Sequence, residues 1–384
     1  MEIDQPKENY IPVTIRYSDE NVLEAGILDP SLLRNAALAL INNIGAHPDN
    51  FPDALNDLLV AEAHRATYRD LLVTSSKYLL ENRDDTFIKY TNPCWPSEAL
   101  KVIGLLLRTR NDFRFAGRTG FDRGMFYWSL TRYLLPEMWR YFSACVYSKK
   151  LGEDGMTILG QSILVRCSRA LQSIDEIGKL FYSYRDNNTS DEIMYHFDYF
   201  TLLLSGALDA QARVAFNIHE IKIKERSVNF RNPDFVNKLQ ADDPELAQFI
   251  NSNYFQDFSL IISKTRNTIH GAGLLPLMHN DLNGQKTILI KVTKADAESI
   301  WNVCEKYGLL TEWGIQKLAD LVTIEPYTFS KKLLGHTLKI INEIARLTKV
   351  EKLFPDSSLI PESKPPVDDL TFSQEVGERL LMLV

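Results

Sequence analysis

Leucine, alanine and isoleucine recur at three- and four-residue intervals along most of the chain, which is the spacing of an apolar stripe on an α-helix. Runs of β-branched residues, which would favour strands, are few. The pattern therefore predicts a mainly α protein, a multi-helix bundle. The expected helices cover residues 30–44, 53–81, 98–109, 126–148, 158–184 and 191–221. Thr189 with Glu192 resembles a capping box at the start of the last one.

The pattern changes after residue 219. The segment up to residue 244 is polar and contains four basic residues, Lys222, Lys224, Arg226 and Arg231. It predicts an irregular connection that faces solvent. An amphipathic helix is expected at 253–270, followed by a small β-hairpin around Asn283-Gly284, a pair typical of hairpin turns. Further helices are expected at 293–307 and within 326–347.

These patterns divide the chain into four expected regions. Residues 1–150 form an N-terminal helical region, and residues 151–280 form a second helical domain. Residues 281–354 form a small α/β region that contains the hairpin. Residues 355–384 begin with a segment rich in proline and charge, which predicts an extended tail that ends in a short helix.

The helix expected before the hairpin carries side chains suited to chemistry. Arg266 and His270 lie four residues apart, so they share one helix face. In steps of four the same stripe continues back through Ile262 and Phe258, which places the polar pair at the end of an apolar seam. We expect a site at the edge of a helix-packing groove. The simpler alternative is that both side chains satisfy the carbonyl groups at the end of the helix.

The string RNTIHG at residues 266–271 closes this helix, and a long helix with the string DAQAR at 209–213 precedes it. Both features resemble HEPN-type helical domains, which occur in prokaryotic toxins, phage-defence proteins and RNA-processing enzymes. Catalytic members share an arginine, a following polar residue and a histidine after about four to six intervening residues. Arg266 and Asn267 match this pattern and His270 matches by type, although only three residues separate it from Arg266.

The resemblance implies a HEPN-like core and a metal-independent RNA endonuclease or toxin effector in phage defence, working as a homodimer in which two motifs meet. Arg266 would stabilise the phosphorane charge and His270 would accept the proton of the attacking 2′-hydroxyl. Asn267 would orient the phosphate or the imidazole. The alternative is a non-catalytic HEPN-like scaffold or sensor that binds a protein partner, in which Arg266 and His270 are structural.

Two carboxylates on the preceding long helix are candidate supports for this motif. Asp198 and Asp209 fall on nearly one face of an otherwise apolar helix. Because a carboxylate inside such a stripe needs a partner, we expect Asp209 or Asp198 to contact Arg266 or His270.

Two other pairings stay open. Asp209 can pair with Arg213 at i,i+4 in the ordinary way. Arg213 and His219 have five residues between them, which fits the HEPN spacing better than Arg266 and His270 do. No polar residue follows Arg213, however, so we interpret this second pair as a coincidence.

Arginines also alternate with phenylalanines between residues 108 and 124, a composition suited to holding phosphates and stacking on bases. The alternative is a solvated loop anchored by a buried ring. Four arginines of this stretch are expected to contact RNA, namely Arg110, Arg114, Arg118 and Arg123. Lys264, on the helix that carries Arg266, is a further expected contact.

Composition restricts the function further. A chain of 384 residues with 45% hydrophobic content can bury sizeable cores, and a net charge of −7 argues against a broad basic surface, so RNA contact must be confined to a local patch. The four cysteines are far apart and form no C-x-x-C pair, which predicts buried, reduced thiols and no zinc site.

Other classes of protein are disfavoured by missing motifs. The sequence contains no glycine-rich phosphate-binding motif and no H-E-x-x-H motif, so we expect no nucleotide cofactor, no metal and no other cofactor. The first ten residues lack the features of a signal peptide, and charged residues interrupt the most apolar helix. We therefore expect a cytoplasmic protein with no membrane partner.

Overall fold

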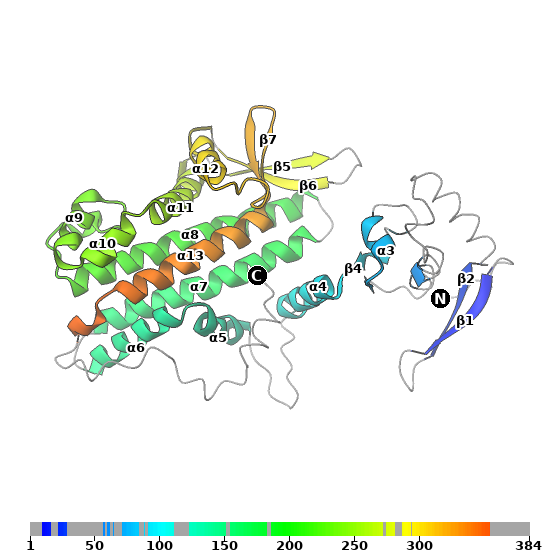
Figure 1. Ribbon diagram of the computed structural model, residues 1–384, viewed down its shortest axis with the longest axis horizontal. Helices are drawn as coiled ribbons and strands as arrows, with labels where there is room; N and C mark the ends of the chain where they lie inside the picture. Colours follow the sequence, from blue (N-terminus) through cyan, green and yellow to red (C-terminus); the bar gives the residue numbers. More distant parts are fainter. Residues whose placement is uncertain are drawn as a thin grey trace. The chain divides into compact units, whose positions relative to one another are not determined.

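Eleven α-helices make up most of the part of the chain that the computed structural model describes (Figure 1). The described residues are 10–16, 22–28, 57, 60–61, 64, 71–83, 88, 91–110, 123–150, 154–182, 186–271, 274–280, 286–292 and 294–353. The prediction of a mainly α protein is confirmed. The chain divides into two units, residues 1–104 and 105–384. The boundaries expected near residues 150 and 280 stay predictions.

Short strands occur in the first unit. Strand β1 (Tyr10–Arg16) pairs antiparallel with β2 (Val22–Leu28), and β3 (Leu72–Val73) pairs parallel with β4 (Pro93–Cys94). Helix α3 covers only Lys77–Glu81. The continuous helix predicted for 53–81 is therefore wrong at its end, because residues 72–73 bond to a strand that is distant in sequence. The helix predicted for 30–44 lies outside the described residues.

The helices predicted from residue 98 onwards form, with shifted ends. Pro136 ends one helix and starts the next, because proline has no N–H to continue the hydrogen-bond ladder. The helix predicted for 126–148 is therefore two helices. The observed elements are α4 (Pro96–Thr109), α5 (Arg123–Leu134), α6 (Pro136–Lys150), α7 (Asp154–Phe181) and α8 (Asn187–Ile218).

The N-cap of α8 is Asp186, whose carboxylate accepts a hydrogen bond from the Thr189 backbone N–H at 2.8 Å. The capping box predicted for Thr189 and Glu192 is therefore wrong. Thr189 lies inside the first turn and is itself the residue that is capped, since Asp186 starts the helix three residues earlier.

The irregular connection predicted for 219–244 contains helix α9 (Pro233–Asp242), which corrects the prediction, and α10 (Pro244–Ile250) follows directly. Each helix starts with proline at its first position, after the N-caps Asn232 and Asp243. Ahead of α9 lies a single 3₁₀ turn, η3 (Glu225–Ser227).

A four-stranded antiparallel sheet follows the motif helix α11 (Asn253–Gly271). The predicted hairpin is confirmed as strands β5 and β6, although its turn at residues 283–284 lies outside the described residues. A second hairpin, which the sequence pattern did not reveal, completes the sheet in the order β5-β6-β8-β7. The strands are β5 (Leu275–Asn280), β6 (Lys286–Lys291), β7 (Ile315–Leu318) and β8 (Leu321–Ile324).

The last helices agree with the predicted ones. Helix α12 covers Lys294–Lys306, and α13 covers Pro326–Leu347, with the 3₁₀ turn η4 (Val350–Leu353) after it. The expected terminal tail and its short helix lie outside the described residues.

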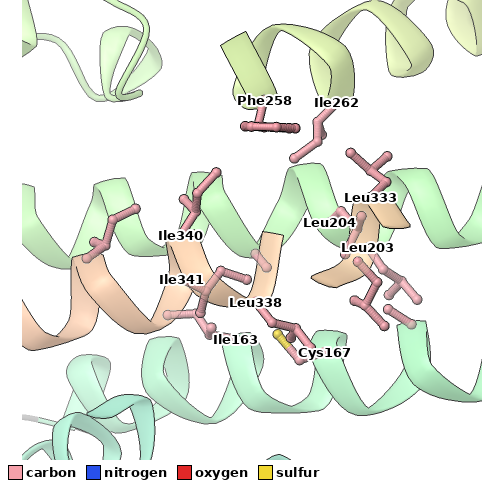
Figure 2. Close-up of a cluster of buried hydrophobic side chains, with 14 of the residues drawn as sticks. Ile163, Cys167, Leu203, Leu204, Phe258, Ile262, Leu333, Leu338, Ile340 and Ile341 are labelled. Carbon is pink, nitrogen blue, oxygen red and sulfur yellow. The ribbon is translucent and has the colours of Figure 1, made fainter. Parts of the chain in front are cut away.

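Helices α7, α8 and α13 pack against one another, and α11 packs on α8 and α13 (Figure 1). Figure 2 shows where apolar side chains of all four helices meet. Burial of each such side chain contributes about 1.5–3 kcal/mol, so this cluster holds α11 against α8. Its labelled members are Ile163, Cys167, Leu203, Leu204, Phe258, Ile262, Leu333, Leu338, Ile340 and Ile341.

The thiols behave as the sequence suggested. All four cysteine side chains are buried, and none of them forms a disulfide. Burial raises the pKa of the Cys167 and Cys304 thiols to about 12. Within the described residues, no helix has the length and apolarity that a membrane crossing would need.

Candidate functional site

The motif lies at the carboxyl end of α11, where the predicted apolar seam gives way to polar side chains. Phe258 and Ile262 are buried, Arg266 is half-buried, and Asn267 and His270 are exposed. Figure 2 shows Phe258 and Ile262 extending from α11 toward the cluster formed with α8 and α13. The packing of this seam therefore determines where Arg266 projects.

Arg266 projects into a cavity of about 450 Å³ between α8, α11 and the segment that connects α8 to α9. This arginine cavity, as we call it, is lined by both apolar and charged side chains. The charged ones are Asp209, Arg213, Glu225, Arg226, Arg231 and Arg266. Asn267 and His270 do not line it, so of the three motif residues it contains only Arg266.

Asp209 and Arg266 both line the arginine cavity, and the expected contact between them stays a prediction. Although the Asp209 side chain is open to the cavity, loss of hydration raises the pKa of the Asp209 carboxyl, while Arg266, Arg213 and Arg166 act in the opposite direction. The ordinary pair of Asp209 with Arg213 does not form. Instead Arg213 Nη1 lies 3.5 Å from Glu225 Oε1.

Arg166 of α7 reaches this region because residue 206 of α8 is glycine. A Cβ at Gly206 would collide with the Arg166 guanidinium. The glycine therefore leaves room for another positive charge near Asp209.

Asp198 does not line the arginine cavity. It lies eleven residues before Asp209 on α8, about 16 Å along the helix axis. Burial raises the pKa of its carboxyl, and Oδ1 is buried without a hydrogen-bond partner.

Lys264 is held on the other side of α11. Its ammonium group lies 3.2 Å from Asp296 Oδ1 of α12, and Thr268 Oγ1 donates to Asp296 Oδ2 at 3.0 Å. These contacts connect α11 to α12, so Lys264 would have to leave an ion pair before it could bind RNA.

The arginines between residues 108 and 124 have different environments. Arg108 is buried and binds Asp175 of α7 through two hydrogen bonds, and Arg123 forms an ion pair with Glu176. Arg110 directly follows α4, and the described residues resume at Arg123. Arg114 and Arg118, two of the predicted RNA contacts, lie outside the described residues.

Arg213 and His219 do not form a joint site. Arg213 lines the arginine cavity, whereas the His219 side chain is buried, with Nδ1 bonded to Asp242 and Nε2 3.5 Å from Asp243. Bonds from Lys352 and His219 lower the pKa of Asp242 to about 2. His219 therefore serves to attach the end of α8 to the start of α10.

Arg226 and Arg231 are the cavity residues that sequence reasoning missed. The polar sequence predicts a solvent-facing segment, and both arginines are indeed exposed, but their side chains also line the cavity. The useful signal was its concentration of basic residues directly after a helix that carries Arg213.

Comparison with known proteins found no relative of this chain. No family model matches the chain, and neither a curated protein nor a solved structure shows significant similarity to it. Within the described ranges, no three His, Cys, Asp or Glu side chains gather in a way that could hold a metal ion. The candidate site is therefore the end of α11 together with the arginine cavity.

Proposed function

We propose that this protein binds RNA at the arginine cavity and cleaves it next to Arg266 as a HEPN-like, metal-independent endonuclease or toxin effector. The supporting observation is that the motif arginine opens into a cavity with three further arginines, in a chain whose overall charge is negative. A guanidinium group binds phosphate oxygens in a bidentate manner, and the local excess of arginine attracts an anion.

In the proposed reaction the 2′-hydroxyl loses its proton and its oxygen attacks the adjacent phosphorus, while the bond from phosphorus to the 5′-oxygen breaks and that oxygen takes a proton from solvent. The products are a 2′,3′-cyclic phosphate and a 5′-hydroxyl end. Arg266 stabilises the extra negative charge of the phosphorane, exposed His270 one helical turn away accepts the 2′-hydroxyl proton, and Asn267 orients the phosphate. The HEPN resemblance adds that two motifs act together in a homodimer.

A second candidate is a non-catalytic protein of the same type that binds a partner. It is favoured by the positions of His270 and Asn267, which do not line the cavity with Arg266.

The test is incubation of the purified protein with total cellular RNA in the presence of a metal chelator. We expect fragments with 2′,3′-cyclic phosphate ends, and we expect His270→Ala to slow their formation at least about a hundredfold. His196→Ala, which changes a histidine of α8 that does not line the cavity, is the matched control.

Absence of cyclic ends with the wild-type protein, or an unchanged rate with His270→Ala, would reject cleavage and favour the second candidate. Thermal unfolding of each variant excludes loss of fold as the cause. Light scattering after size exclusion measures whether the active species is a dimer.

A further inference from the structure

The lining of the arginine cavity combines two kinds of side chain. Four are the arginines Arg213, Arg226, Arg231 and Arg266. Five are apolar, namely Leu208, Val228, Phe230, Phe255 and Ile262. A ligand that matches this lining carries a compact anion and an apolar group.

The charges in the cavity do not balance. Four guanidinium groups face two carboxylates, those of Asp209 and Glu225, which leaves a surplus of two positive charges. Among the residues that the structure describes, Arg226, Arg231 and Arg266 form no salt bridge. Arg226 and Arg231 are exposed, so their guanidinium groups are accessible to a ligand. Partial desolvation lowers the pKa of Arg231, and no carboxylate acts against this shift.

A phosphate monoester fits this surplus. It carries about −1.5 to −2 charges at neutral pH, whereas a phosphodiester within a strand carries one. Arginines hold its oxygens through paired hydrogen bonds. The volume of about 450 Å³ lies within the range of small-molecule sites.

The uncharged polar side chains of the lining indicate what the phosphate is attached to. Ser205, Ser263 and Asn229 line the cavity and can exchange hydrogen bonds with a ribose or with the edge of a base. A phenyl ring would leave these polar groups without partners, and a simple sugar would leave the apolar lining side chains uncovered. A nucleoside satisfies both.

We propose that the arginine cavity binds a nucleoside monophosphate unit, either as a free nucleotide or as the 5′-phosphorylated end of an RNA strand. Arg231 and Arg226 grip the phosphate from the η3 side and Arg266 from α11. Glycine-rich nucleotide motifs hold phosphate through backbone N–H groups at a helix start. This cavity would hold phosphate through arginine side chains instead. A chain that lacks the glycine-rich motifs can therefore still bind a nucleotide here.

The test is calorimetric titration of the full-length protein with adenosine 5′-monophosphate. We expect binding at least about tenfold tighter than that of inorganic phosphate, adenosine or phosphotyrosine. Arg231→Gln should weaken it at least about tenfold, the effect of a lost charge-assisted hydrogen bond. Arg226→Gln should act in the same direction. Arg169→Gln, on the exposed side of α7 and away from the cavity, is the matched control and should change nothing.

The source of the phosphate is identified by titrating the protein with a short RNA that carries a 5′-phosphate and with the same RNA without it. A preference for the phosphorylated strand over adenosine 5′-monophosphate identifies an RNA end, and the reverse order identifies a free nucleotide.

The proposal is overturned if the nucleotide does not bind, if phosphotyrosine binds equally well, or if Arg231→Gln and Arg169→Gln have the same effect. Because His270 does not line the cavity, His270→Ala should still bind the nucleotide, so failure of cleavage and failure of this proposal are distinguishable.

Discussion

Asp209 places a carboxylate in a cavity that otherwise gathers arginines. Desolvation raises the pKa of this carboxyl even though Arg266, Arg213 and Arg166 all favour its ionised form. Loss of water therefore outweighs attraction at this position. An ionised Asp209 would also compete with an incoming phosphate for the same guanidinium groups.

We predict that Asp209→Asn binds adenosine 5′-monophosphate more tightly and is more stable than the wild type at neutral pH. The folded-state pKa of Asp209 lies above its ordinary value of 3.8, so the folded state loses stability as the pH rises through that range. The advantage of asparagine should therefore vanish below pH 3.8. Thermal unfolding against pH, together with calorimetry, measures both effects.

Asp198→Asn is the control for this prediction, because burial also raises the pKa of that carboxyl but the residue does not line the cavity. It should show the same pH trend in stability with unchanged nucleotide affinity. Equal affinity gains for both variants would contradict a local role for Asp209.

At the scale of elements, the end of α7 and the start of α13 approach closely at Gly178. A Cβ at this residue would lie 2.6 Å from Tyr327 Cε2. The Tyr327 ring also packs between Phe181 and Tyr182, with ring centroids 5.6 and 5.9 Å away. A side chain at residue 178 would therefore have to displace the Tyr327 ring from its contacts with Phe181 and Tyr182.

We predict that Gly178→Ala lowers the free energy of unfolding by about 1–3 kcal/mol, the usual cost of overpacking. Gly335→Ala on α13 is the matched control, because a Cβ there meets no atom within 4 Å. Gly335→Ala should raise the free energy of unfolding by about 0.5–1 kcal/mol, since alanine is the better helix former. Urea unfolding measures both, and a loss of equal size in the two variants would contradict the packing argument.

Within the larger unit, a buried ion pair of Arg108 with Asp175, joined by Tyr127, connects α4, α5 and α7. Arg108 binds Asp175 with Nε–Oδ2 and Nη2–Oδ1 distances of 2.5 and 3.1 Å, and the Tyr127 hydroxyl donates to the same carboxylate at 2.5 Å. All three side chains are excluded from water. Removing one member leaves the others buried without compensation.

We predict that Asp175→Ala lowers the free energy of unfolding by about 3–5 kcal/mol, because the Arg108 charge stays buried without its carboxylate. Glu351→Ala is the control, because it removes the partly exposed ion pair with Arg140. It should lower the free energy of unfolding by less than about 1 kcal/mol. Chemical denaturation compares the two variants. A small effect of Asp175→Ala would mean that water reaches Arg108.

Elements with strong local signals were predictable. The periodic apolar residues of α8, α11 and α13 and the residues flanking the hairpin turn each act within a few positions of the chain. Helices α9 and α10 were predictable in principle from Asn232-Pro233 and Asp243-Pro244, but the polar composition of the segment concealed them. Strand β3 has no comparable local signal, because its partner β4 is about twenty residues away.

The sequence by itself determined that the chain is mainly helical, that a β-hairpin follows α11, and that Arg266 and His270 share one helix face. Only the tertiary structure decided that Arg266 faces Asp209, Arg226 and Arg231 across a cavity while His270 stays outside it. The physical reason is the separation along the chain of the residues that each feature depends on. Caps, turns and apolar periodicity depend on neighbouring residues, whereas a cavity wall depends on how α8, α11 and their connection pack over one shared core.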